Sequence, residues 1–422
     1  MRGHAVVREK LRRAFTSVAG RHWIVILAMV KSAAGGMLAV GLPVKLDRLG
    51  WTDWDLGVFT AVTATVYTVA CSVYSLVLHK VPLQRMMAVA AAVAGAAALG
   101  LWAVPYRFPL FLFGAGFAFG SALFWPSLMA WIGESDEAHL VGDLSAFNCA
   151  WTVSSTAGFI TGGILETVAG GLSLVLVAVV LGLLMLAVPF AHIRGRGAFP
   201  ATVASPPATP LLPRRFLNAG RLAAVLVTLA IAVPGAIFVK LNSALGYSPR
   251  DFGIFLGLQG GAQAFVFLGL GVLQGWRYRR WPLVAPLVLS GGGAALLFFP
   301  FGGGAFAWHV LALGFVLLGA GMGLGYATGF YYTIASGGNR RRKAGLFEAL
   351  VSVQHAVGGA LGGSVAAAFG RRVPYLVIAA LAALGVGVQG GLLKGVAPSA
   401  GPGARDAAGE PAGKPGRAAE NL

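Results

Sequence analysis

Twelve apolar segments, separated by short polar breaks, run along the 422-residue chain. Each segment reaches the about 20 mostly apolar residues that a helix needs to cross the hydrocarbon core of a bilayer. The segments cover positions 23–44, 56–78, 86–104, 109–132, 144–165, 171–191, 222–241, 252–273, 283–301, 307–334, 344–369 and 374–393. We therefore predict an all-α integral membrane protein with twelve transmembrane helices.

The second six segments repeat the first six. Three groups of residues recur at offsets of 196, 205 and 200 residues, which indicates a tandem duplication. Positions 49–57 return at 245–253, Gly114, Gly116 and Gly120 return as Gly319, Gly321 and Gly325, and Gly158, Gly162 and Gly163 return as Gly358, Gly362 and Gly363. We expect these glycines to let helix backbones approach closely in lipid. The duplication predicts two pseudo-symmetric six-helix bundles, at 21–193 and 218–394.

Basic residues lie mostly on one side of the predicted membrane. The formal net charge is +18, and 24 of the 32 Lys and Arg residues fall on the side of the termini, against 7 on the other side. This asymmetry places both termini in the cytoplasm. It also accounts for the positive charge without a nucleic-acid partner. We expect a multi-pass protein of a prokaryotic inner (plasma) membrane, with a basic cytoplasmic N-terminus at 1–20, a Pro- and Arg-rich cytoplasmic linker at 194–217 and a disordered cytoplasmic tail at 395–422.

Cysteine usage excludes two kinds of site. The chain has only Cys71 and Cys149, and both fall inside predicted spans. Neither a disulfide framework nor a zinc site can be built from them. We expect no metal and no cofactor, and nothing in the sequence resembles an ATP-binding domain.

The two six-helix repeats, the proline-rich basic middle loop and the cytoplasmic termini together resemble the major facilitator superfamily over positions 21–393. Members often carry a Gly-Pro-x-x-Gly-Gly element on the fifth helix, and positions 158–163 are similar to it except that Phe159 replaces the proline. His79 stands where the family's basic motif has an acid. The subfamily therefore stays open.

The resemblance implies a secondary transporter that moves a small organic solute by alternating access. Proton coupling is left open, and the partners expected are the solute, protons and membrane lipid, with the protein acting as a monomer. A membrane-embedded enzyme and a non-transporting sensor or scaffold are the alternatives. The enzyme is disfavoured because no acids and histidines converge at an interface.

Two polar stripes follow helical spacing, one in each half. The eleventh segment carries Glu348, Ser352, His355, Gly359 and Gly363 on one face, and the fifth carries Asn148, Thr152, Ser155, Phe159 and Gly163. A polar stripe must face protein or water, so the two stripes are candidates for opposite walls of one cavity. Polar packing between neighbouring helices is the alternative.

Aromatic and amide side chains are further candidates for the cavity wall, with core or membrane-belt packing as the alternative. They are Trp125, Trp151, Tyr331, Tyr332, Gln259 and Gln263. A mostly apolar cavity with a few polar groups favours an amphipathic or lipophilic solute, and we lean towards an efflux substrate.

An ionisable side chain inside a membrane span is a candidate functional residue, because burying it there costs roughly 2.5 to 3.5 kcal/mol. Lys31 and Glu348 are such residues. They are candidates for proton coupling or for a gate contact, with snorkelling of Lys31 and capping or pairing of Glu348 near the interface as the alternative. In the outer loops, Asp53 or Asp55 of the first repeat is a candidate partner for Arg250 of the second.

Overall fold

The computed structural model describes residues 2–76, 83–132, 137–188, 214–299, 302–336 and 340–394. These residues form twelve α-helices, one at each predicted segment, one 3-10 turn η2 (Gln274–Trp276), and no strand. The helices are α1 (Arg2–Arg48), α2 (Asp53–Leu76), α3 (Leu83–Ala103), α4 (Arg107–Ile132), α5 (Glu137–Val168), α6 (Leu172–Ala187), α7 (Arg214–Ala244), α8 (Pro249–Val272), α9 (Trp281–Phe298), α10 (Ala305–Ala335), α11 (Arg340–Phe369) and α12 (Val373–Leu392). The all-α prediction is confirmed.

Ten helices of the described chain are long and apolar enough to cross a membrane. The shorter apolar helix α6 has 16 residues, and α5 is not among the ten. The first helix differs from its predicted span, because α1 begins at Arg2 and includes the basic segment 1–20 from that residue on. The predicted linker reaches into α7, which begins at Arg214; its other residues and the predicted tail lie outside the described residues.

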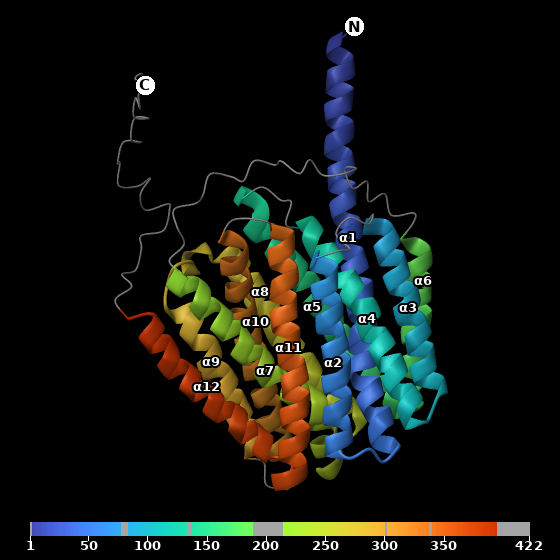
Figure 1. Cartoon of the computed structure of the whole chain (residues 1–422), viewed down its shortest axis with the longest axis vertical. Coiled ribbons are helices and arrows are strands. Elements are labelled where there is room, and N and C mark those ends of the chain that lie inside the picture. The colour runs from blue at the N-terminus through green and yellow to red at the C-terminus, as the bar shows by residue number, and fades with distance from the viewer. Residues whose placement is uncertain are drawn as a thin grey trace.

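The helices stand side by side as one bundle, with α3 and α6 at one edge and α9 and α12 at the other (Figure 1). The first half comprises α1–α6 and the second α7–α12. The halves meet mainly where α2 packs on α11 and α5 packs on α8. We call the end of the bundle where α1 ends and α2 begins the outer end, following the predicted orientation; it lies opposite the start of α1 (Figure 1).

The repeated motif at 49–57 and 245–253 makes the same turn twice. Gly50 and Gly246 have φ of 74° and 77°, a backbone conformation that favours glycine after a helix end. The next helix then begins with a capping box in each copy: Thr52 and Asp55 exchange hydrogen bonds before α2, and Ser248 and Asp251 do so before α8. The duplication in sequence is therefore a duplication in structure.

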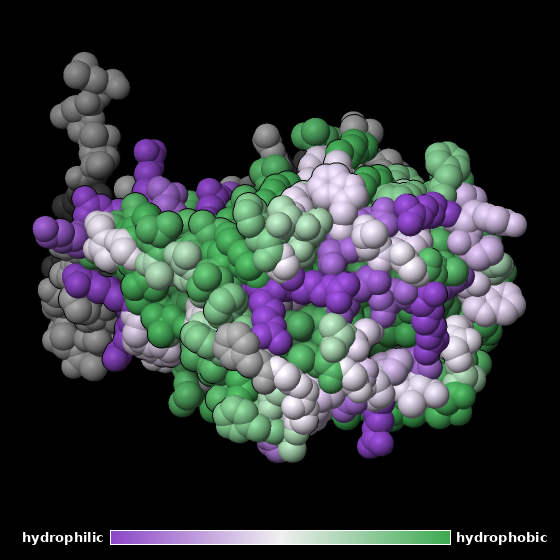
Figure 2. Space-filling model, turned by 90° about the horizontal axis from the view of Figure 1, so that it is seen from below, coloured by the Kyte–Doolittle hydropathy of each residue, from purple (hydrophilic) through white to green (hydrophobic). Residues whose placement is uncertain are grey.

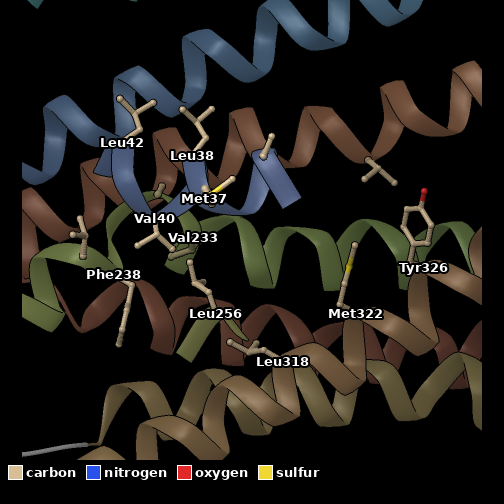
Figure 3. Packing of buried hydrophobic residues seen from close by; sticks show 14 of the residues in the cluster. Met37, Leu38, Val40, Leu42, Val233, Phe238, Leu256, Leu318, Met322 and Tyr326 are labelled. Atoms are coloured by element: carbon tan, nitrogen blue, oxygen red, sulfur yellow. The ribbon is translucent and has the colours of Figure 1, made fainter. Parts of the chain in front are cut away.

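A single cluster of buried apolar side chains extends through both halves. Figure 3 shows Met37, Leu38 and Val40 of α1 near Val233 of α7. These contacts place α1 and α7 together at the centre of the molecule, where the equivalent first helices of the two halves meet.

Candidate functional site

Glycines let the two halves touch backbone to backbone near the outer end. A Cβ on Gly57 of α2 would lie 2.6 Å from Cα of Gly363 on α11, and one on Gly163 of α5 would lie 3.0 Å from Cα of Gly253 on α8. Gly57 and Gly253 are equivalent in the two repeats, as are Gly163 and Gly363. The two contacts are thus the same contact made twice, which gives the interface a pseudo-twofold axis.

Two ion pairs join the halves at the same end. Lys240 Nζ lies 2.6 Å from Asp47 Oδ1, and Arg371 Nε lies 3.0 Å from Asp53 Oδ2. Ser243 also donates a hydrogen bond of 2.7 Å to Asp47, and these two residues are 196 positions apart, as equivalent residues are. Hydrophilic residues form a band across this end of the molecule (Figure 2).

The predicted pairing of Arg250 with Asp53 or Asp55 is not formed in this structure. The Asp55 carboxylate accepts hydrogen bonds from Thr52 in the capping box of α2 and lies 3.2 Å from Arg107 of its own half. The carboxylate of Asp53 is taken by Arg371, and the backbone N–H of Arg250 donates to Thr167 at 3.1 Å. Asp55 is therefore a local structural residue.

The stripe of α11 faces α2 and α10. Glu348 is 8% exposed and accepts a hydrogen bond of 2.7 Å from the Tyr326 hydroxyl, with Tyr67 of α2 as a second phenol beside it. Ser352 lies 2.8 Å from the Thr68 hydroxyl of α2. Further out, Gly359 and Gly363 pack on the α2 backbone, and His355, between Ser352 and Gly359, is half-buried.

The stripe of α5 satisfies its hydrogen bonds within the helix. Asn148 accepts from the indole N–H of Trp151 at 3.0 Å, the Thr152 hydroxyl donates to the Asn148 carbonyl, and Ser155 donates to the Trp151 carbonyl at 2.8 Å. Asn148 and Thr152 are buried. The backbone carbonyl of Phe159 lies against Gly253 of α8. This face of α5 therefore contacts α8 near the outer end of the bundle.

A row of aromatic rings crosses from the first half to the second. Trp125 contacts Trp151 with ring centroids 6.4 Å apart, Trp151 contacts Phe267 of α8 at 6.2 Å, and Phe267 contacts Tyr326 at 6.3 Å. The row ends at the Glu348 carboxylate, which Tyr326 holds. Trp125 and Trp151 therefore lie at the junction of the halves.

The two other predicted aromatics lie elsewhere. Tyr332 is fully buried, packs on Phe216 and accepts a hydrogen bond of 3.0 Å from the backbone N–H of Tyr278. Tyr331 packs on Trp276. Both side chains belong to a cluster inside the second half, because this part of α10 packs on α7 and η2. We correct their assignment to core packing.

The amides of α8 are buried without a full set of partners. The backbone of Gln259 and Gln263 packs against Gly319 and Gly323 of α10. Gln259 Oε1 and Gln263 Nε2 have no hydrogen-bond partner in the described chain. A buried amide atom without a partner is costly, so a bound water or solute group would stabilise it.

The predicted packing glycines lie against neighbouring helices. A Cβ on any of them would fall within 3.4 Å of an atom on another helix. Backbone meets backbone most closely between Gly158 and α1 and between Gly319 and α8. The set comprises Gly114, Gly116, Gly120, Gly158, Gly162, Gly163, Gly319, Gly321, Gly325, Gly358, Gly362 and Gly363.

Lys31 is buried inside the first half. It is 2% exposed, its Nζ donates to Ser121 of α4 at 3.0 Å and lies 4.4 Å from the ring centre of Phe117. Lys31 stands 17 residues before the end of α1, whereas Ser121 stands 14 residues after the start of α4 at the same outer end. The side chain therefore points towards the outer end of the bundle, and snorkelling to the headgroups at the opposite end does not describe it.

Comparison with known proteins gives a likeness of fold. No family model matches the chain, and no curated protein matches it. Among solved structures, the nucleoside transporter NupG matches 89% of this chain and 99% of its own with a TM-score of 0.68. A bacterial homolog of the human lysosomal transporter Spinster, in an inward-facing and unoccupied conformation, matches 90% of this chain and 96% of its own with a TM-score of 0.69. Both are 12% identical in sequence to this chain.

Proposed function

We propose that this chain, which has the fold of the major facilitator superfamily, is a secondary transporter that works by alternating access. The observation that supports the proposal most strongly is the join between the halves at the outer end. Two equivalent glycine contacts and two ion pairs close this end, and no covalent link crosses it among the described residues. Such a join can open without unfolding either half.

The energies involved suit a switch. Exposed ion pairs are each worth about 0 to 1 kcal/mol, and the pairs here are only partly buried. Two conformations that differ by a few kcal/mol can be exchanged by the binding of a solute or an ion. We therefore infer that this structure represents the state closed to the outside, and that the opposite state separates Asp47 from Lys240.

The substrate we propose is a small amphipathic organic solute that binds between the halves. Trp125 and Trp151 would supply apolar surface, and Gln263 would supply an unpaired amide N–H. Export is the direction we propose, and the sign of the gradient that drives transport tests it. Nucleosides belong in the solute panel because NupG has a similar fold and is a nucleoside transporter.

Glu348 is the residue we propose for proton coupling. It is buried, its described partners are the phenols of Tyr326 and Tyr67, and no described Lys or Arg pairs with it. A carboxyl group in this setting can take up and release a proton without breaking an ion pair, and His355 on the same face is a candidate relay.

Glu348→Gln should abolish transport driven by a pH gradient in proteoliposomes while solute counterflow persists. Unchanged dependence on the pH gradient in this variant would contradict the assignment.

Cross-linking tests the alternating-access proposal. In a chain without Cys71 and Cys149, we would introduce Asp47→Cys with Lys240→Cys and join them with a short bismethanethiosulfonate reagent. We expect transport to stop and to return after reduction, because this pair bridges the halves.

The control is a pair on the same end but within one half. Asp55→Cys with Arg107→Cys replaces an ion pair of 3.2 Å inside the first half. The same reagent should leave transport through this variant unchanged. Full transport through the cross-linked Asp47–Lys240 variant would refute the proposal.

A further inference from the structure

We infer that Lys31 binds the anionic group of the solute, which makes the substrate class an amphipathic organic monoanion. The inference rests on the proposed transport function and names the chemistry of its solute: Ser121, the partner of Lys31, lies one helical turn before Trp125 on α4. It starts from an ammonium group that is buried in the first half with one hydroxyl and one aromatic ring as its partners.

The Lys31 ammonium has one hydrogen-bond acceptor and no counter-charge among the described residues. A lysine has three N–H donors, and Ser121 accepts one of them. The described chain offers no carboxylate to Lys31, since its acids pair elsewhere: Glu166 with Arg48, and Glu348 with Tyr326. A buried charge without a counter-charge is expensive, so a negative group that entered here would be bound strongly.

The second repeat has an apolar side chain where the first has this lysine. By the repeat offsets, Lys31 corresponds to Val227 on α7, and Ser121 corresponds to Tyr326 on α10. Val227 is buried and packs against Gly325, so an apolar side chain fills the equivalent place. A residue required for packing would be expected in both halves. Lys31 instead breaks the pseudo-symmetry, as Glu348 does with its equivalent Asn148.

The surroundings limit the ligand to one negative charge and an apolar body. Lys31 is the only described cationic side chain that is buried within a span, so a second negative charge would find no partner. Phe117 covers the ammonium, and Leu27, Ala28 and Ala34 of the same helix are buried in the apolar core. A carboxylate, sulfonate or phosphodiester on an apolar group fits this chemistry.

Equilibrium binding tests the inference without transport. The protein in lipid nanodiscs is dialysed against 1-naphthoate, naphthalene-1-sulfonate, the neutral 1-naphthamide and inorganic phosphate. We expect the two aromatic anions to bind about ten-fold more tightly than the amide, as for a hydrogen bond to a charged group. Phosphate should not compete. Equal affinity for naphthoate and naphthamide, or competition by phosphate at the level of naphthoate, would overturn the inference.

Variants locate the effect. Lys31→Gln should lower the affinity for naphthoate to that for the amide, and Lys31→Arg should keep the preference for the anion. Lys31→Val places the residue of the second repeat in the first, so it should fold and should also lose the preference. Lys343→Gln removes a lysine charge at the cytoplasmic end of α11 and should change nothing. If folded Lys31→Gln and Lys31→Val keep the preference for the anion, Lys31 is not the anion-binding residue.

The result is separable from that of the cross-linking test. If the anion preference depends on Lys31 but the cross-linked protein still transports, the anion site is supported and alternating access is refuted. If the cross-link stops transport but the protein shows no anion preference, alternating access is supported and only the assignment of Lys31 as the anion site is refuted.

Discussion

At the scale of single residues, the buried carboxylate of Glu166 has more partners than any other acid that the structure describes in the first half. It is 1% exposed, accepts hydrogen bonds from Ser173 at 2.6 Å and from the backbone N–H of Gly171 at 3.0 Å, and pairs with Arg48 at 2.7 Å. These contacts tie α1, α5 and α6 together at the outer end. Glu166 therefore contributes to the packing of α1 against α5 and α6.

Glu166→Ala should therefore destabilise the protein. The change leaves buried donors without an acceptor, which typically costs about 1 to 3 kcal/mol. We expect a lower melting temperature in detergent, measured by intrinsic fluorescence. Arg107→Ala is the matched control, because it removes the partner of an exposed ion pair and should cost less. Equal losses in the two variants would contradict the assignment.

Single residues were also where prediction from the sequence was weakest. The depth of Lys31 in its span was evident, but its direction depends on where α4 places Ser121. Asp53 or Asp55 is the predicted partner of Arg250, but Asp55 instead exchanges hydrogen bonds with Thr52 in a capping box, a motif for which the spacing Thr52-x-x-Asp55 is suitable. The pair Asp47–Lys240 was missed because it depends on how two distant helix ends face each other. Tyr332 was misplaced for the same reason.

At the scale of elements, the hydrophobic segments and the repeat predicted most of what is seen. Apolar length alone located each helix, because a span in lipid must satisfy its backbone internally. The repeated Leu-Gly and Thr/Ser-x-x-Asp positions became equivalent turns and capping boxes. The start of α1 at Arg2 was not predicted, since the charged segment before position 21 carries no apolar signal.

The glycine contact between α2 and α11 gives a prediction at this scale. Gly57→Ala would place a Cβ 2.5 Å from the carbonyl oxygen of Gly359, so the outer end could not close fully. Overpacking of this kind costs about 1 to 3 kcal/mol, which would shift the equilibrium towards the outward-open state by about 5- to 150-fold. Maleimide should then label Thr60→Cys, beside Gly359 in this interface, faster than in the parent.

The control for this variant is Gly182→Ala on α6, where a Cβ would meet no atom within 4 Å. Its labelling rate should match that of the parent. If Gly57→Ala and Gly182→Ala label Thr60→Cys equally fast, the glycine contact does not set the closure of the outer end.

At the scale of the whole molecule, the contacts between the halves follow the symmetry of the sequence. Gly57 meets Gly363 and Gly253 meets Gly163, and Asp47 meets its own equivalent, Ser243. A twofold join of this kind can open at one end as it closes at the other. Two buried ionisable residues break this symmetry, because Lys31 of the first half stands where the second has Val227, and Glu348 of the second stands where the first has Asn148. The charged groups that we propose to act on solute and proton are therefore divided between the halves.

The most direct test measures the distance between the halves at both ends during transport. One pair of spin labels is placed at Leu49→Cys and Ala244→Cys on the outer end, and a second at Arg85→Cys and Arg279→Cys on the opposite end. We expect double electron–electron resonance to show two populations for each pair, with the outer distance lengthening as the inner one shortens when solute or a pH gradient is applied. Distances that stay fixed, or that change in the same direction at both ends, would contradict alternating access.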